Sequence, residues 1–151
     1  MGQTAKYCSV FAMLSALLVL LPAAGWAAPA VSIEVKTVLA SSGETYLDPQ
    51  LSEIARELQG LFRYTSYRLL GRDRLTLQPR QTGNVALPGN RRLQITYQGV
   101  ENRRVELLLK MYKNQSNVFE TSIRLNNRSS ITVGGPRYEE GYLLFNIYSA
   151  F

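Results

Sequence analysis

Arginine and tyrosine side chains gather between residues 62 and 74, and this segment holds the side chains best suited to binding chemistry. Guanidinium groups form paired hydrogen bonds with phosphate or carboxylate, and aromatic rings stack on sugars and bases. The candidate binding residues are Arg63, Tyr64, Tyr67, Arg68, Arg72 and Arg74. We expect this segment to contact an anionic partner. The alternative interpretation is that one tyrosine belongs to the core and the arginines cover a solvated strand face.

The charge of the chain also favours an anionic partner. The chain has 17 lysines and arginines against 11 acidic residues, a formal net charge of +6, and most of the cations are arginines. Arginine favours forked contacts with carboxylate or phosphate. The expected partners are therefore an anionic envelope component or an acidic protein surface. Nucleic acid is not expected, because the chain carries the export pattern described below.

Most familiar catalytic chemistry is excluded by composition. The chain contains no histidine, which is the usual general base near neutral pH and the commonest metal ligand. Two pairs of acids, Glu53 with Glu57 and Glu139 with Glu140, could in principle support glycoside hydrolysis. Both pairs are interpreted as solvated surface acids. We expect a protein that is not an enzyme, with no catalytic residues, no metal and no cofactor.

The N-terminus has the pattern of a secretory signal peptide. Lys6 precedes an apolar run over residues 10 to 21, which is too short to span a bilayer as a helix. Pro22 ends this run, and small residues follow it. Cleavage is predicted after Ala27, with a position after Ala30 as the alternative.

Processing at this site divides the chain into a cleavable signal peptide, residues 1–27, and a single β-rich globular domain, residues 28–151. The only cysteine, Cys8, would be removed with the signal peptide, so we expect no disulfide in the mature chain. The predicted location is periplasmic or secreted, without a permanent membrane anchor.

One amphipathic helix is predicted near the N-terminus of the mature chain. Before it, apolar residues alternate with polar ones over residues 31 to 39, which is typical of a strand with one buried face. Asp48-Pro49 then has the composition of a helix start. Leu51, Ile54 and Leu58 form an apolar stripe, and Gly60 is the predicted C-terminal stop.

About eight short strands are predicted for the whole domain, and most of them follow the helix. Gly71-Arg72-Asp73, residues 99 to 102 and Gly134-Gly135-Pro136 are interpreted as turns between them. Most connections have hairpin length, so neighbouring strands should pair antiparallel. The predicted fold class is α+β: a mostly antiparallel β sheet or small sandwich with one helix covering an apolar face.

The C-terminus supports a rival interpretation. Residues 143 to 151 alternate apolar positions and end with Phe151, which resembles the terminal strand of an outer-membrane β-barrel. Several predicted strands are too short to span a membrane, and the helix has no natural place in a minimal barrel. A small integral outer-membrane β-barrel is therefore the alternative, with an outer-membrane location.

The layout resembles an uncharacterised family of small exported proteins of Gram-negative bacteria. The resemblance rests on Asp48-Pro49 with its helix, on residues 62 to 70, and on Val133-Gly134-Gly135-Pro136 followed by Gly141-Tyr142-Leu143-Leu144. It implies no activity. The sequence therefore predicts an exported, non-enzymatic binding or assembly module of the bacterial cell envelope. A carboxylate-dependent glycan hydrolase is the third alternative.

Overall fold

The computed structural model describes residues 28–151. The predicted signal peptide, with Cys8 and the residues before the Ala27 cleavage position, lies outside the described residues. Within the described part of the chain, no helix combines the length and the hydrophobicity needed to cross a bilayer.

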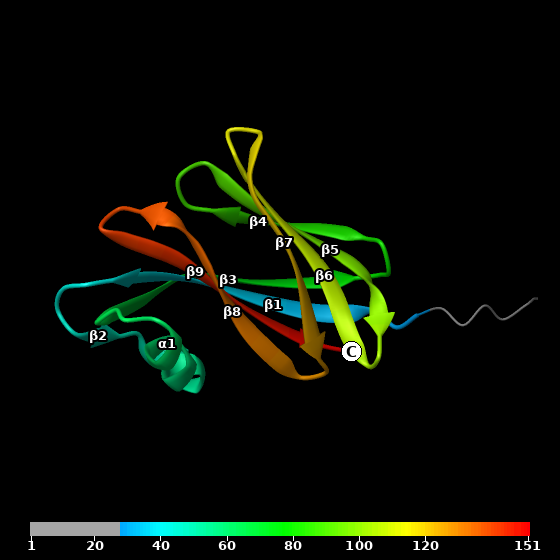
Figure 1. The fold of residues 1–151 in the computed structure, drawn as a ribbon, viewed down its shortest axis with the longest axis horizontal. Helices are drawn as coiled ribbons and strands as arrows, with labels where there is room; N and C mark the ends of the chain where they lie inside the picture. Colours follow the sequence, from blue (N-terminus) through cyan, green and yellow to red (C-terminus); the bar gives the residue numbers. More distant parts are fainter. Residues whose placement is uncertain (1–27) are drawn as a thin grey trace, which may run out of the picture.

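Two sheets make up the domain (Figure 1). The five-stranded sheet has the order β2-β3-β1-β9-β8, and the four-stranded sheet has the order β4-β5-β6-β7. The strands are β1 (Val31–Ser41), β2 (Tyr46–Leu47), β3 (Ser66–Leu77), β4 (Thr82–Leu87), β5 (Arg91–Glu101), β6 (Arg104–Lys113), β7 (Ser116–Asn126), β8 (Ser129–Tyr138) and β9 (Gly141–Ala150). All pairs are antiparallel except the short β2–β3 pair, so the predicted fold class is confirmed.

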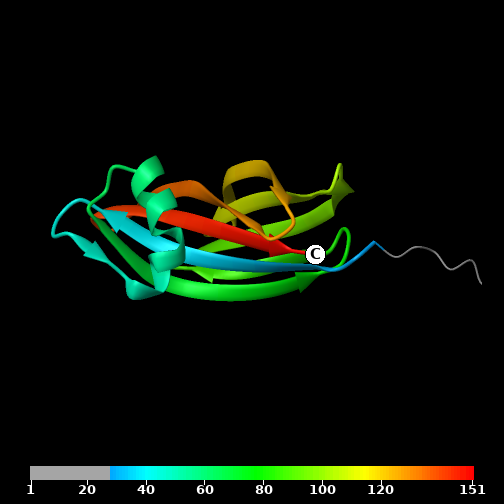
Figure 2. The ribbon, with the colours of Figure 1, turned by 90° about the horizontal axis from the view of Figure 1, so that it is seen from below.

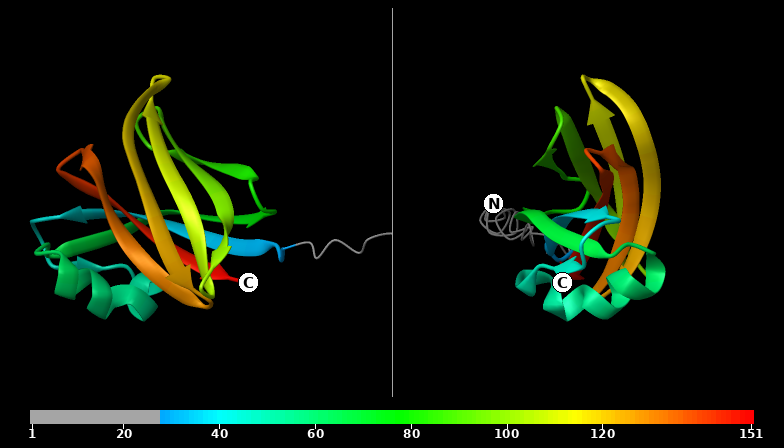
Figure 3. Two further views of the ribbon diagram at one scale, coloured as in Figure 1. Left: turned by 45° about the vertical axis from the view of Figure 1, so that its right-hand side comes forward. Right: turned by 90° about the vertical axis from the view of Figure 1, so that its left-hand side faces the viewer.

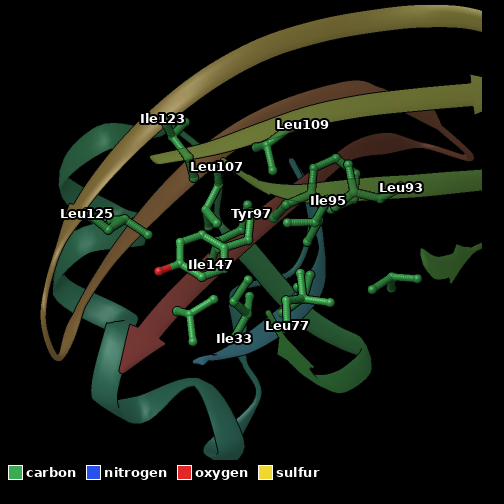
Figure 4. Close-up of a cluster of buried hydrophobic side chains, with 14 of the residues drawn as sticks. Ile33, Leu77, Leu93, Ile95, Tyr97, Leu107, Leu109, Ile123, Leu125 and Ile147 are labelled. Atoms are coloured by element: carbon green, nitrogen blue, oxygen red, sulfur yellow. The ribbon is translucent and has the colours of Figure 1, made fainter. Parts of the chain in front are cut away.

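The main core lies between the two sheets, whose strands cross at a large angle (Figure 3). Alternate residues of each strand point inward, as the period of two requires. In β1 these are Val31, Ile33 and Val35, none of which is exposed to solvent. Figure 4 shows how the inward side chains of both sheets interdigitate, among them Ile33, Leu77, Leu93, Ile95, Tyr97, Leu107, Leu109, Ile123, Leu125 and Ile147.

A short helical segment covers part of the outer face of the five-stranded sheet (Figure 2). It begins as a 3-10 helix, η1 (Pro49–Ile54), and continues as α1 (Ala55–Leu61). The predicted stripe is confirmed, because Leu51, Ile54 and Leu58 are buried. They pack on the buried apolar side chains of this outer face, which are Val38, Ala40, Tyr67 and Leu144.

Asp48 begins the helix as predicted, and it also ties the helix to the sheet. Its Oδ1 accepts a hydrogen bond from the Gln50 backbone N–H at 3.0 Å, and its Oδ2 accepts one from the Leu69 N–H at 3.4 Å. The predicted stop is wrong: Gly60 lies inside α1, which ends at Leu61 with Phe62 in an extended conformation. The predicted location of the helix near the N-terminus of the mature chain is not supported, because the helix follows β1 and β2 in the chain.

The predicted turn at Gly71-Arg72-Asp73 is wrong, because β3 runs without a turn from Ser66 to Leu77. A β-bulge interrupts the strand there instead. Leu69 pairs with Val38 and Gly71 with Thr37, so Leu70 has no partner across the ladder. An inserted residue of this kind moves the side chains beyond it to the other face.

A further predicted turn lies inside a strand, and of the one predicted at residues 99 to 102 only Asn102 lies in a turn. Gly134-Gly135-Pro136 belongs to β8 at a shift in register, and β5 continues past Gly99 to Glu101 with a similar shift. At Gly135 an added Cβ would overlap the Phe145 ring and lie 2.9 Å from the Leu143 carbonyl oxygen. Glycine is therefore needed there for close approach of β9, and the turn itself falls at Glu139-Glu140.

Candidate functional site

The helix leaves the rest of the outer face of the five-stranded sheet bare, toward one end of β1 and β9 (Figure 2). Polar side chains line this part. In the ladder, Glu34 lies between Arg74 of β3 and Tyr148 of β9, and Lys36 lies between Arg72 and Asn146. We call this region, with Ser130 and Thr132 of β8, the outer polar face. Its members are Glu34, Lys36, Arg72, Arg74, Ser130, Thr132, Asn146 and Tyr148.

A groove of about 390 Å³ is hollowed in the outer polar face where it meets the helix. Its lining is Glu34, Lys36, Glu53, Ile54, Arg128, Ser130, Asn146 and Tyr148. Two polar residues of this lining are nearly buried, since Lys36 is 5% exposed and Asn146 is 2% exposed. Arg128, from the turn between β7 and β8, is exposed at its edge.

Lys36 is held between two carboxylates. Its Nζ lies 3.7 Å from Glu34 Oε1 in the same strand and 3.5 Å from Glu53 Oε2 in η1. Both distances exceed those of short charge-assisted hydrogen bonds, so the ammonium is paired without being tightly bound. The ion pair with Glu53 links the sheet to the helical segment.

Glu34 is the one acid among the members of the outer polar face, and it has three cationic partners. Arg74 Nε donates to its Oε2 at 2.8 Å, and Arg72 Nε lies 3.7 Å from its Oε1. Burial of the carboxyl opposes ionisation, but the hydrogen bond from Arg74 and the charges of Arg72 and Lys36 outweigh it and lower the pKa of Glu34. The carboxylate therefore stays ionised and partly neutralises three cations.

A row of hydrogen bonds runs beside the groove from the sheet to the helix. Asn146 Nδ2 donates to Thr132 Oγ1 at 3.0 Å, and Thr132 Oγ1 donates to Glu57 Oε1 at 2.6 Å. Glu57 is half-buried, so the interpretation of it as a solvated acid is wrong. Glu53 is solvated as predicted, with 82% of its side chain exposed, but it also contacts Lys36.

The six predicted site residues do not form one surface. Arg72 and Arg74 belong to the outer polar face, whereas Arg68 pairs with Leu39 and lies on the opposite side of the sheet. In a regular strand Arg68 and Arg72 would share a face, because they are four residues apart. The bulge at Leu70 separates them.

The other three predicted residues lie near the end of α1. Tyr67 is only 1% exposed, and its hydroxyl donates to the Leu58 and Phe62 carbonyl oxygens at 3.1 and 2.8 Å. Its ring is part of the packing under the helix and cannot serve as a stacking surface. Tyr64 is half-buried against Tyr142, with ring centroids 6.0 Å apart, and Arg63 is exposed.

The sequence did not single out Lys36, Asn146, Thr132 or Arg128 as site residues. Lys36 belongs to the polar side of the strand predicted at residues 31 to 39, and nothing in the neighbouring sequence predicts its burial. These residues meet only because β1, β8 and β9 are adjacent, which is a long-range property of the sheet. Over residues 28–151, histidine, cysteine and acidic side chains form no group of three or more that could hold a metal ion.

Comparisons with known proteins give no relative: no family model, no curated protein and no solved structure matches this chain. The chemistry of the groove is then the guide. Its lining offers the Lys36 ammonium, the Arg128 guanidinium, the Asn146 amide and two hydroxyls, all of which can donate hydrogen bonds to an anionic oxygen.

Proposed function

We propose that the protein is an exported, non-enzymatic binding module of the cell envelope, and that the outer polar face with its groove is the binding surface. The observation that carries the proposal is the nearly buried Lys36 and Asn146 in the wall of an open hollow. Burial of a lysine is unfavourable for folding unless it is well paired. A hollow lined by such groups is better explained by ligand binding than by packing.

The proposed ligand carries a phosphate group at a lipid surface. Lys36 and Arg128 line the groove. Arg72 and Arg74 lie next to it on the outer polar face, and these two arginines share Glu34 with Lys36 as an ion-pair partner. Among residues 28–151 no ion pair includes Arg128, so its guanidinium is available to an anion. Forked guanidinium contacts suit phosphate oxygens, and Arg72 and Arg128 are the residues we expect to make them.

The non-enzymatic part of the proposal rests on composition. Acid–base catalysis near neutral pH is usually carried by histidine, of which the chain has none. Glu34, in the groove lining, is paired with three cations. The two helix acids, Glu53 in the lining and Glu57 beside it, are engaged with Lys36 and Thr132. These contacts position the helix over the sheet and explain both acids without a catalytic role.

Vesicle co-sedimentation tests the proposal. The protein is mixed with vesicles of phosphatidylcholine alone, or of phosphatidylcholine with phosphatidylglycerol, over a range of salt concentrations. We expect binding only to the anionic vesicles, weakening with salt. The double variant Arg72→Gln/Arg128→Gln should bind about tenfold more weakly, which corresponds to about 1.4 kcal/mol. Its salt dependence should also be flatter.

The matched control is Arg92→Gln/Arg104→Gln, which removes two arginines from the four-stranded sheet, where Arg92 lies over the Tyr112 ring and Arg104 is exposed. The control should bind like the unchanged protein. Equal losses in the control and in the double variant would reduce the interaction to net charge and contradict the proposed surface. Competition by inorganic phosphate would show that the free anion, rather than the lipid, is sufficient.

A further inference from the structure

A second hollow, of about 350 Å³, lies at the other end of the five-stranded sheet and on its opposite face. It is lined by Leu39, Ser41, Ser66, Arg68, Glu139 and Glu140. In the β1–β3 ladder Leu39 pairs with Arg68 and Ser41 with Ser66, so these four side chains point to one side. The two glutamates come from the turn between β8 and β9. We call this hollow the end pocket.

Charges of opposite sign line the end pocket without neutralising one another. Over residues 28–151, none of the ion pairs within 4.0 Å involves Arg68, Glu139 or Glu140. The Arg68 guanidinium carbon lies 5.9 Å from the centre of the Tyr46 ring, a contact that holds the side chain by cation–π attraction. Two carboxylates and one guanidinium therefore lie in one small cavity without an ion-pair partner in the described chain, and the Tyr138 hydroxyl hydrogen-bonds to Glu139.

The pocket has the features of a site for a small molecule with two opposite charges. A lone anion would meet Arg68 but also two carboxylates, and a lone cation would meet the carboxylates but also the guanidinium. A zwitterion satisfies both sides, with its carboxylate on Arg68 and its ammonium on Glu139 or Glu140. The Ser41 and Ser66 hydroxyls can add hydrogen bonds, and Leu39, only 8% exposed, offers an apolar surface.

We propose that the end pocket binds a zwitterionic amino compound of the size of an amino acid or dipeptide. The volume lies at the lower end of the range of about 300–1,000 Å³ that is typical of small-molecule pockets. The end pocket shares no residue with the outer polar face, so this proposal can be tested independently of the proposed lipid binding.

Titration with defined dipeptides tests the proposal. Backbone amide chemical shifts of the ¹⁵N-labelled protein are followed during addition of alanyl-alanine, N-acetyl-alanyl-alanine or alanyl-alanine amide; alanine is the single-residue probe. We expect saturable shifts at Ser41, Ser66 and Glu140 with alanine or alanyl-alanine, with a dissociation constant below about 1 mM. Blocking either end should weaken binding at least about tenfold, because one of the two charge contacts is lost.

Substitutions separate the two halves of the pocket. Arg68→Gln should remove the preference for a free carboxylate, and Glu139→Gln/Glu140→Gln the preference for a free amine. The control Arg104→Gln, an exposed arginine of β6, should leave the titration unchanged. All the altered side chains are exposed; Arg68 and Arg104 lie in strands, and Glu139 and Glu140 lie in a turn. An unchanged amide spectrum outside the pocket verifies that each variant is folded. Equal binding of blocked and free dipeptides, or no saturable shift, would overturn the proposal.

Discussion

The two sheets present outer faces of similar composition but different construction. On the four-stranded sheet, Lys110 lies 3.2 Å from Glu120, and Arg124 lies 3.4 Å from Glu106. These pairs stand on a bare sheet, and 30% of the Lys110 side chain is exposed. On the five-stranded sheet, the helical segment rises beside the charges, and only 7% of the Lys36 side chain is exposed.

The comparison shows that the strength of an ion pair on a strand depends more on whether a helical segment packs beside it than on the charged residue itself. Exposed ion pairs are weakened by water and salt and contribute little to stability. The wall supplied by Glu53 and Ile54 of η1 limits the contact of Lys36 with water and strengthens its interactions. On the outer face of the five-stranded sheet, these charges lie in the lining of a groove.

The largest expected effect separates the two lysines. Lys36→Ala should lower the free energy of unfolding by about 2 kcal/mol, because it removes a nearly buried cation and the packing of its stem. Lys110→Ala should cost less than about 0.5 kcal/mol, since its partner is exposed. Urea denaturation of both variants measures the two values. Similar losses would contradict the comparison between the faces.

An intermediate effect concerns pH. The pKa of Glu34 is lowered in the folded protein, so its ionisation stabilises the fold above the ordinary glutamate pKa and this contribution is lost as pH falls through the lowered value. Glu34→Gln should therefore reduce stability near neutral pH and make the decline in stability below about pH 4.5 shallower. Thermal denaturation between neutral and acidic pH measures this.

The matched variant Glu120→Gln removes an exposed acid from the four-stranded sheet and should keep the steeper decline of the unchanged protein. A decline that is equally steep in Glu34→Gln and in the unchanged protein would show that other groups dominate acid sensitivity.

The smallest expected effect contrasts neighbours in β1. Lys36 points to the outer face and has partners, whereas Thr37 points inward, is 2% exposed, and its Oγ1 has no hydrogen-bond partner in the described structure. Thr37→Val should therefore raise the free energy of unfolding by about 0.5–1 kcal/mol. Thr132→Val should lower it by about 1 kcal/mol, because its hydroxyl bonds Asn146 and Glu57. Destabilisation by Thr37→Val would contradict this account.

Local patterns in the sequence predicted the fold class. The alternation of Val31, Ile33 and Val35 identified β1 and its buried face, and Asp48 identified the start of the helix. Each of these signals depends on residues close together in the chain. The same physical rules also predicted mostly antiparallel pairing from short connections.

The arrangement of the candidate site depends on information that local patterns do not contain. A one-residue bulge at Leu70 sends Arg68 and Arg72 to opposite faces, although their spacing favours a common one. Likewise, Lys36 and Asn146 are far apart in sequence and meet through the β1–β9 register. Gly135 was interpreted as part of a turn because its actual requirement, close approach of β9, is a tertiary contact.

The hydrogen bonds of Asp48 give one carboxylate two tasks. One oxygen fixes the first turn of the helical segment, and the other holds the amide of Leu69, directly before the bulge. Asp48 therefore holds both the helical segment that forms one wall of the groove and the start of the bulge that places Arg68 and Arg72 on opposite faces. Fluctuations that open this corner would loosen both together, so hydrogen exchange of the Gln50 and Leu69 amides is expected to proceed in step.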